Sequence, residues 1–344
     1  MKIYHENGYV NIPEILKTRL PFIFIVGGRG TGKTYGALKY TQDTNTPFLF
    51  MRRTLSEIES LSMPELNPFK KINSDTGTNI VPAPMGKHMY AFYNGNTENG
   101  KTVISGAPIA PILALSTIAN IRGFDASDKR LLIYDEFISE SHVKRIRNES
   151  SALFNAYETI NRNRELNGET PLQMLALSNS ETLDNPIFIA LGIVGKFEKM
   201  QRNNQEYSID TERGIGMFYL QKSPISEMKS HTALYRATRG TSFSDIAIKN
   251  KFSDISDISI RHVPLVEYSP LVQIGEIFVY KHKCNMEYYV TTHKSGNPPK
   301  FGTTEIERQR AFRIYSYVWQ SYFRNRVFFE SSMCEILFND YFKI

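Results

Sequence analysis

The feature that most constrains this chain is an apolar run of five residues followed at once by a glycine-rich loop. Residues 22–26 are β-branched or aromatic, which predicts a buried strand. Residues 27–34, Gly-Gly-Arg-Gly-Thr-Gly-Lys-Thr, match G-x-x-x-x-G-K-[ST] at every fixed position, and residues 35–40 are compatible with a helix. This order predicts a P-loop. The alternative is a glycine-rich turn that binds no ligand. Such a turn would not need the motif's spacing over all eight positions.

Each part of this loop has an expected role. The glycines allow backbone N–H groups to point at phosphate oxygens, and the start of the following helix adds partial positive charge. Lys33 would reach the β- and γ-phosphates, and the Thr34 hydroxyl would bind Mg²⁺. Arg29 would contact phosphate or pair with Glu136, or else point into solvent. The predicted cofactor-binding residues of the loop are Gly27, Gly28, Arg29, Gly30, Thr31, Gly32, Lys33 and Thr34.

A second apolar run, at residues 131–134, ends in Asp135 and Glu136. We expect a buried strand beside the one that leads into the phosphate loop, so that both carboxylates face the nucleotide. Asp135 would bind Mg²⁺ together with Thr34, and Glu136 would polarise the water that attacks the γ-phosphate. A solvated acidic turn is the alternative. Burying unpaired carboxylates would cost several kcal/mol, and Mg²⁺ would supply the missing partner.

Two further sets of residues are candidates for the same site. The apolar run at residues 172–177 ends in Ser178 and Asn179, which would hydrogen-bond the γ-phosphate or the attacking water, or else only cap a turn. A transferring phosphate also needs cations, often from a neighbouring subunit. Arginines near helix ends commonly favour only the helix dipole and solvent. The candidate arginines are Arg122, Arg162 and Arg164.

Strand-like and helix-like segments alternate over the first two thirds of the chain, which predicts an α/β fold with a mostly parallel sheet and flanking helices. We expect a P-loop ATPase domain at residues 1–222, a linking helix at 223–242 and a smaller C-terminal α/β domain at 243–344. Within the first domain, residues 72–106 are turn-rich and predict a hairpin-like insertion. In the C-terminal domain we expect strands near 258–266, 271–280 and 286–292, and helices at 305–327 and near 329–338.

Composition excludes several classes of protein. The two cysteines are far apart, so disulfide scaffolds and zinc ribbons are excluded, and the seven histidines show no ligand spacing, so Mg²⁺ is the only metal proposed. No stretch has the roughly 18 apolar residues of a membrane span, and we expect a cytosolic protein without a membrane partner. The net charge of +6 mildly favours a polyanionic partner. Aromatics in the C-terminal domain fit a core, whereas its arginines would contact phosphates; these are Arg308, Arg310, Arg313, Arg324 and Arg326.

An ordered set of motifs resembles that of a known family. The set is G-G-R-G-T-G-K-T, R-G-F-D ahead of L-L-I-Y-D-E-F, R-N-R-E, and L-S-N-S followed by D-N-P-I-F, over roughly residues 20–222. It looks like the packaging ATPases of small tailed phages of the phi-twenty-nine type. These are short relatives of terminase large subunits in the P-loop ASCE superfamily. The C-terminal third matches in size and placement rather than in motif.

The resemblance implies a function and partners. Such proteins form a ring, a homopentamer, on the portal of an empty capsid and drive double-stranded DNA inward by ATP hydrolysis. Some members also dock on a structured packaging RNA. The subunit would work in the host cytoplasm, dock on the procapsid transiently and be absent from the mature virion.

The resemblance also implies residue roles. The phosphate-loop residues and the two strand-end carboxylates would act as described above, the family's trans-acting arginine falls on Arg162, and its other trans-acting basic residue falls on Arg122. In larger terminases the C-terminal domain is an RNase-H-like nuclease. Here the candidate strand at residues 275–283 has Glu276 at its edge and no central Asp. We therefore expect a vestigial nuclease that binds nucleic acid without cutting it.

Two other functions remain open. Another P-loop translocase, such as a DNA helicase or pilus-type motor, would share the hydrolysis site. A nucleotide-gated DNA-binding module would need no efficient water activator, so Glu136 argues against it. No motif marks the residues that grip DNA; the candidates are Arg52, Arg53, Lys70, Lys71 and Lys101.

Overall fold

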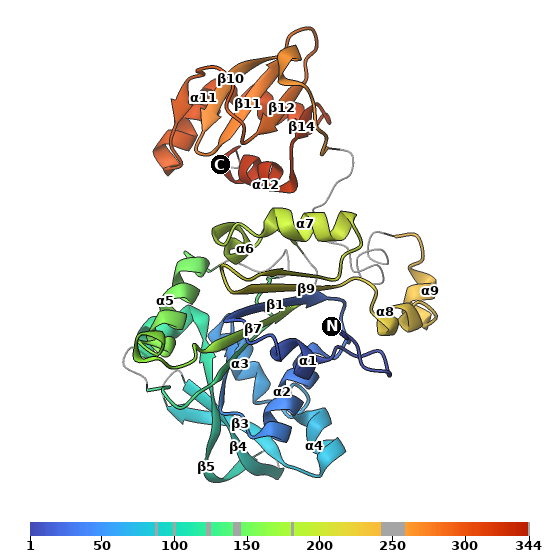
Figure 1. Cartoon of the computed structure of the whole chain (residues 1–344), viewed down its shortest axis with the longest axis vertical. Helices are drawn as coiled ribbons and strands as arrows, with labels where there is room; N and C mark the ends of the chain where they lie inside the picture. The colour runs from blue at the N-terminus through green and yellow to red at the C-terminus, as the bar shows by residue number, and fades with distance from the viewer. Residues whose placement is uncertain are drawn as a thin grey trace. The chain divides into compact units, whose positions relative to one another are not determined.

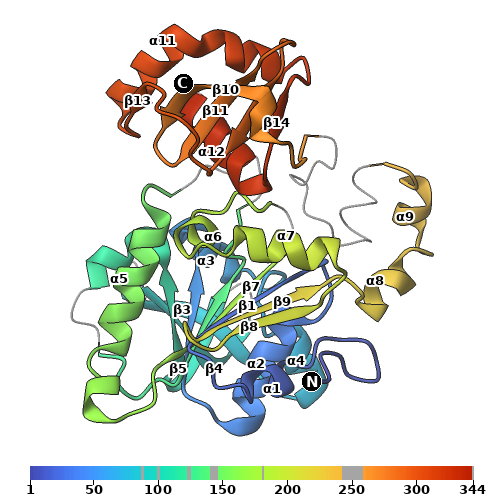
Figure 2. The ribbon, with the colours of Figure 1, turned by 45° about the horizontal axis from the view of Figure 1, so that its top comes forward.

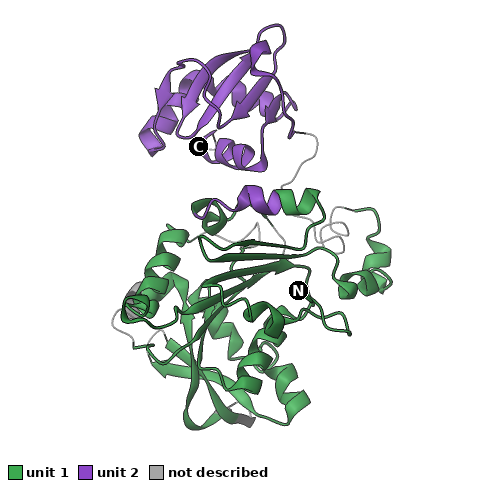
Figure 3. Cartoon of the chain, viewed as in Figure 1, with its two compact units in different colours: residues 1–190, 199–252 green, residues 191–198, 253–344 purple. Residues whose placement is uncertain are grey.

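The computed structural model describes residues 1–86, 89–98, 101–121, 125–139, 146–179, 182–241 and 259–342. The chain forms two compact units (Figure 3): unit 1 consists of residues 1–190 and 199–252, and unit 2 of residues 191–198 and 253–344. The expected domain border at residue 243 lies outside the described residues. The division into residues 1–222, 223–242 and 243–344 therefore stays a prediction.

Unit 1 is built on a nine-stranded sheet with the order β3-β4-β5-β2-β6-β7-β1-β9-β8. Six adjacent strands run parallel: β5 (Lys101–Ala114), β2 (Phe48–Arg52), β6 (Leu131–Asp135), β7 (Gln173–Ser178), β1 (Phe22–Gly27) and β9 (Ile215–Leu220). Antiparallel strands complete the sheet: β8 (Tyr207–Asp210) at one edge, and β3 (Ile80–Gly86) and β4 (Met89–Glu98) at the other. The predicted mostly parallel α/β sheet and its hairpin insertion are confirmed.

The strand order differs from our expectation at one point that matters for the site. β6 does not lie beside β1, because β7 lies between them and pairs with both. Crossover connections decide which strands are neighbours, and motif order along the chain does not reveal them. The end of β7, with Ser178 and Asn179, therefore lies between the phosphate loop and Asp135.

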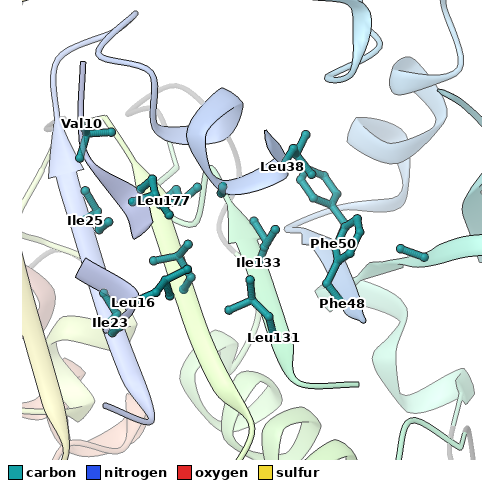
Figure 4. Packing of buried hydrophobic residues seen from close by; sticks show 14 of the residues in the cluster. Val10, Leu16, Ile23, Ile25, Leu38, Phe48, Phe50, Leu131, Ile133 and Leu177 are labelled. Atoms are coloured by element: carbon teal, nitrogen blue, oxygen red, sulfur yellow. The ribbon is translucent and has the colours of Figure 1, made fainter. Parts of the chain in front are cut away.

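Helices cover both faces of the sheet, as a parallel sheet requires (Figure 1 and Figure 2). On one face, strand residues such as Ile23, Ile25 and Ile133 pack against helices in a single buried cluster (Figure 4). These helices are α1 (Ile12–Leu16), α2 (Lys33–Thr44), α3 (Leu55–Leu61) and α4 (Lys70–Thr76). On the other face, Phe24 and Phe137 meet Phe188 with ring centroids 5.5–6.0 Å apart.

The second face is covered by α5 and α6, and shorter elements complete unit 1. Their bounds are η1 (Leu115–Ile121), α5 (Glu149–Asn161), η2 (Glu165–Asn167), α6 (Pro186–Ala190), α8 (Pro224–Lys229) and α9 (Ala233–Ala237). Helix α7 (Val194–Arg202) has residues in both units. Among the described residues, we find no helix that combines the length and the hydropathy of a membrane span.

Unit 2 is a smaller α/β unit with the strand order β13-β10-β11-β12-β14, which confirms the predicted second module. Its elements are η3 (Leu265–Glu267), β10 (Tyr268–Ile274), β11 (Ile277–His282), β12 (Tyr288–Thr291), β13 (Lys300–Phe301), α11 (Glu305–Tyr322), β14 (Val327–Phe329) and α12 (Ser332–Phe342). The two helices pack on the sheet through one buried cluster that includes Val279, Val318 and Phe338.

Four local expectations were wrong. Where a strand was expected near 258–266, the described residues form an isolated bridge at Ile260 and the start of η3. The single strand expected at 271–280 is a hairpin, because Gly275, with φ of +54°, turns the chain between β10 and β11. The expected linking helix is two short helices, because the poor helix formers at residues 230–232 separate α8 from α9. The helix expected to reach residue 327 ends at Tyr322, and Val327 begins β14 instead.

Candidate nucleotide-binding site

The phosphate loop joins β1 to α2, and its glycines are required by the backbone. Gly30 and Gly32 have φ of +73° and +87°, in the left-handed region that L side chains rarely adopt. At Gly27 the constraint is space, since an added Cβ would lie 2.6 Å from Cβ of Leu220 on β9. The motif therefore encodes a fixed loop shape.

Lys33 is buried at the start of α2. Its Nζ donates hydrogen bonds to the carbonyl oxygens of Gly27 and Gly28, at 2.9 and 2.8 Å, and a longer one of 3.4 Å to Oδ1 of Asn179. Burial lowers the pKa of Lys33 to about 7, even though the carboxylates of Asp135 and Glu136 favour its charged form. An anion that replaced the carbonyl oxygens would stabilise the charged form of this buried lysine more strongly.

Asp135 ends β6 and faces the phosphate loop. The Thr34 hydroxyl donates a hydrogen bond of 2.8 Å to Oδ1 of Asp135, whose side chain is only 3% exposed. Burial raises the pKa of Asp135, and the nearby Arg52 guanidinium opposes this shift. The two halves of the predicted site are thus in direct contact, as the sequence predicted.

Arg52, the last residue of β2, contacts both carboxylates. Its Nη2 lies 2.8 Å from Oδ2 of Asp135, and its Nη1 donates to Oε2 of Glu136. Although burial disfavours the charged guanidinium, the charges of Asp135 and Glu136 raise the pKa of Arg52. Sequence reasoning named Arg52 only as a DNA contact. Its position at the carboxyl end of a strand was the signal that could have placed it in the site.

Glu136 takes an unusual backbone conformation, with φ of +54°. Its side chain is 56% exposed, in contrast to that of Asp135. The partner that the sequence suggested for Glu136 was Arg29, and the structure shows Arg52 instead. Glu136 is therefore accessible to water while it pairs with the Arg52 guanidinium.

Ser178, the last residue of β7, and Asn179, which follows it, make different kinds of contact. Oγ of Ser178 accepts a hydrogen bond of 3.2 Å from the backbone N–H of Ile138, which is a local structural contact. Asn179, in contrast, contacts Lys33 in the phosphate loop. Of the two alternatives that the sequence left open, Ser178 fits the turn and Asn179 fits the site.

The candidate arginines differ in exposure. Arg162 follows α5, is 50% exposed and lies 3.8 Å from Asp125. Arg164 is buried and donates to the carbonyl oxygens of Ala126 and Ser127, at 2.8 and 3.2 Å, so it supports the fold. Arg122 lies outside the described residues.

Arg53 was expected to contact DNA, and this expectation is wrong. Its side chain is 2% exposed and forms an ion pair of 2.7 Å with Glu149, which is equally buried. A guanidinium enclosed in this way cannot reach a DNA phosphate without unfolding its surroundings.

A cavity of about 1090 Å³ adjoins the phosphate loop and is lined by Gly30, Gly32 and Gly36, with Tyr9 and Tyr35 among its walls. Across the part of the chain that the structure describes, no group of three or more His, Cys, Asp or Glu side chains is placed to hold a metal ion. The oxygen pair of Thr34 and Asp135 is a different kind of site, because a nucleotide would supply the other ligands.

The family model described as Podovirus DNA encapsidation protein (Gp16) matches residues 5–263 of this chain. The chain belongs to this family. The resemblance inferred from the motifs is thereby confirmed.

Two curated relatives agree with this assignment. The DNA packaging protein of Bacillus phage B103 is 23% identical over 243 residues, which are 69% of this chain and 66% of that protein. The DNA packaging protein of Bacillus phage phi29 is also 23% identical over 243 residues, 69% of this chain and 64% of that protein. The chain thus spans just under two thirds of the length of these relatives.

Solved structures with similar folds cover almost the whole chain. The Phi-28 gp11 DNA packaging motor superposes with a TM-score of 0.63 and 21% identity, over 98% of this chain and 99% of that one. The bacteriophage Phi-29 viral genome packaging motor assembly gives a TM-score of 0.67 and 16% identity, over 97% and 98% of the two chains. At these identities the likeness establishes the fold.

Proposed function

We propose that this chain is the ATP-hydrolysing subunit of a motor that drives double-stranded DNA into a viral procapsid. Membership of the encapsidation family and the DNA packaging proteins among its relatives support this role. The enzymatic part rests on the hydrogen bond from Thr34 to Asp135, which joins the phosphate loop to the strand end that carries both carboxylates. The proposed assembly is a ring of five identical subunits on the portal of the procapsid, in the host cytoplasm.

Mg²⁺ and ATP are the proposed cofactors, and the residues fit both. The Thr34 hydroxyl and Oδ1 of Asp135 are hard oxygen donors in contact with each other, and Mg²⁺ in such sites takes one or two protein ligands besides water and phosphate oxygens. When bound, the ion would neutralise negative charge on the β- and γ-phosphates. The cavity beside Gly30 and Gly36 offers room for the nucleoside.

The remaining steps belong to side chains of this site. Lys33 would exchange the carbonyls of Gly27 and Gly28 for phosphate oxygens. Glu136 would orient the attacking water and accept its proton, as the water oxygen bonds to the γ-phosphorus and the bond from that phosphorus to the bridging oxygen of ADP breaks. Because Arg52 contacts Glu136, the guanidinium has to release this carboxylate before Glu136 can act as a base.

The arginine roles depend on neighbouring subunits. We propose that Arg162 reaches the nucleotide of an adjacent subunit, which its half-exposed position after α5 permits. Arg122 is the second proposed trans-acting residue. Asn179 would hold the γ-phosphate or the attacking water from within the subunit.

For unit 2 we propose nucleic-acid binding without cleavage, as a vestigial RNase-H-like domain. Four of its five candidate arginines are exposed and would contact phosphates: Arg310, Arg313, Arg324 and Arg326. Arg308 is only partly exposed and lies 3.6 Å from Asp340. A packaging RNA is a further candidate ligand of these cations.

The test is ATP hydrolysis by the full chain with and without double-stranded DNA. We expect DNA to stimulate hydrolysis, and we expect Lys33→Ala to abolish it because the phosphates lose their main cation. Lys17→Ala, which removes an exposed lysine from the end of α1, is the matched control and should leave the rate unchanged. Hydrolysis indifferent to DNA would contradict the motor. Strand displacement without procapsids would favour a helicase instead.

A further inference from the structure

Lys229, the last residue of α8, contacts the phosphate loop although it is 195 or more residues away in sequence. Its Nζ donates a hydrogen bond to the carbonyl oxygen of Arg29. The same atom lies so close to Gly30 that an added Cβ would collide with it. Neither the P-loop motif nor any pattern around residue 229 marks this lysine.

Lys229 lies close enough to another cation, Lys33, to act on it electrostatically. Lys229 and Arg29 both repel Lys33, the first residue of α2, and favour its neutral form. Within the described part of the chain, no carboxylate pairs with Lys229. The two acidic side chains of the site, Asp135 and Glu136, already contact Arg52. The ammonium group of Lys229, which donates to a backbone carbonyl, is therefore available to a polyanionic ligand.

Lys229 resembles Lys33 in its contacts. Each ammonium group donates to backbone carbonyls of the same loop, Lys33 to those of Gly27 and Gly28 and Lys229 to that of Arg29. Partial burial also lowers the pKa of Lys229. A carbonyl is a weaker partner for an ammonium group than a phosphate oxygen, because a bond between two charged groups is the stronger one.

We propose that Lys229 is a second phosphate-binding lysine, which binds the polyphosphate of the nucleotide together with Lys33 and thereby ties α8 to the bound nucleotide. The inference rests on the proposed nucleotide site. A purely structural role, in which Lys229 favours the C-terminal end of the α8 dipole, is the competing explanation.

The test is an equilibrium titration of the full chain with fluorescent ATP and ADP analogues in the presence of Mg²⁺. Lys229→Ala should raise the Kd for the ATP analogue about tenfold, because a charge-assisted hydrogen bond to phosphate is lost. The increase for the ADP analogue should be smaller. Lys229→Arg should stay within about threefold of the wild type, since it keeps the charge. Lys222→Ala, an exposed lysine just before α8, is the matched control and should not change either Kd.

An unchanged Kd in Lys229→Ala, with an unchanged thermal unfolding midpoint, would overturn the inference. If the wild type and Lys33→Ala bound neither analogue, the nucleotide site itself would be wrong. Should Lys229→Ala fail to fold, amine acetylation of the wild type followed by mass spectrometry decides the question. We expect a non-hydrolysable ATP analogue to protect Lys229 but not Lys222, and equal labelling of Lys229 with and without it would refute the proposal.

Discussion

Two consecutive arginines at the end of β2 meet carboxylates in opposite ways. Arg53 and Glu149 are 2% and 1% exposed and form a two-pronged ion pair, with Nε–Oε1 and Nη2–Oε2 distances of 2.7 and 3.3 Å. Arg52 contacts two carboxylates of the proposed nucleotide site, one buried and one 56% exposed. The first pair is matched one to one and belongs to the fold. The second arrangement leaves one carboxylate exposed to solvent, so a ligand can rearrange it.

The largest expected effect is on the rate of ATP hydrolysis, and it concerns the arrangement around Arg52. Glu136→Gln should lower the rate of ATP hydrolysis by about 10²–10⁴-fold, because the proton acceptor is lost. The Kd for ATP and the thermal unfolding midpoint should hardly change, since the side chain is largely exposed. Hydrolysis at the wild-type rate would mean that Glu136 is not the base.

The buried pair should respond in the reverse manner. Glu149→Gln leaves the Arg53 guanidinium enclosed without its carboxylate, which should lower the free energy of unfolding by about 3–5 kcal/mol in urea titrations. The double variant Arg53→Met, Glu149→Leu is the control and should recover most of this loss, because it removes both charges. A loss in the single variant below about 1 kcal/mol would show that the pair is not part of the fold.

Lys33 extends the comparison to pH. Its pKa of about 7 means that the free protein loses this positive charge as pH rises, whereas a phosphate-bound lysine stays charged. ATP binding should therefore take up a proton above pH 7, and the affinity should fall by up to about tenfold per pH unit between pH 7 and 9. Titration calorimetry at pH 8 in buffers of different ionisation enthalpy measures the uptake. An affinity independent of pH over this range would contradict the shift.

The smallest expected effect is a recovery of hydrolysis in mixed subunits. It compares the two arginines after α5, of which Arg162 is half-exposed and Arg164 is buried. If Arg162 acts across a subunit interface, mixing Arg162→Ala with Lys33→Ala subunits should restore part of the hydrolysis rate that each lacks alone, by a few-fold at most. Mixtures of Arg164→Ala with Lys33→Ala are the control, because buried Arg164 supports its own subunit and should give no such recovery. No recovery at any ratio for Arg162 would make it a structural or cis-acting residue.

The sequence predicted those parts of the site whose residues are consecutive in the chain. The phosphate loop and the pair Asp135 and Glu136 follow apolar strands directly, so both the strand and its strand-end side chains could be read locally. Arg52 and Lys229 could not, because their partners lie 84 and 200 residues away and depend on the strand order and on the position of α8. The position of β7 between β1 and β6 could not be predicted for the same reason, because it depends on the strand order. Within unit 2, a single glycine at 275 was too weak a signal to divide one apolar run into two strands.

The left-handed backbone of Glu136 has a consequence for engineering. A residue with a Cβ at positive φ carries roughly 1–2 kcal/mol of strain that glycine avoids. Selection for thermostability alone would therefore favour glycine or asparagine at this position, and such a variant would lack the carboxylate that we propose as the catalytic base. At position 136 the proposed catalytic role and the stability of the backbone therefore favour different residues.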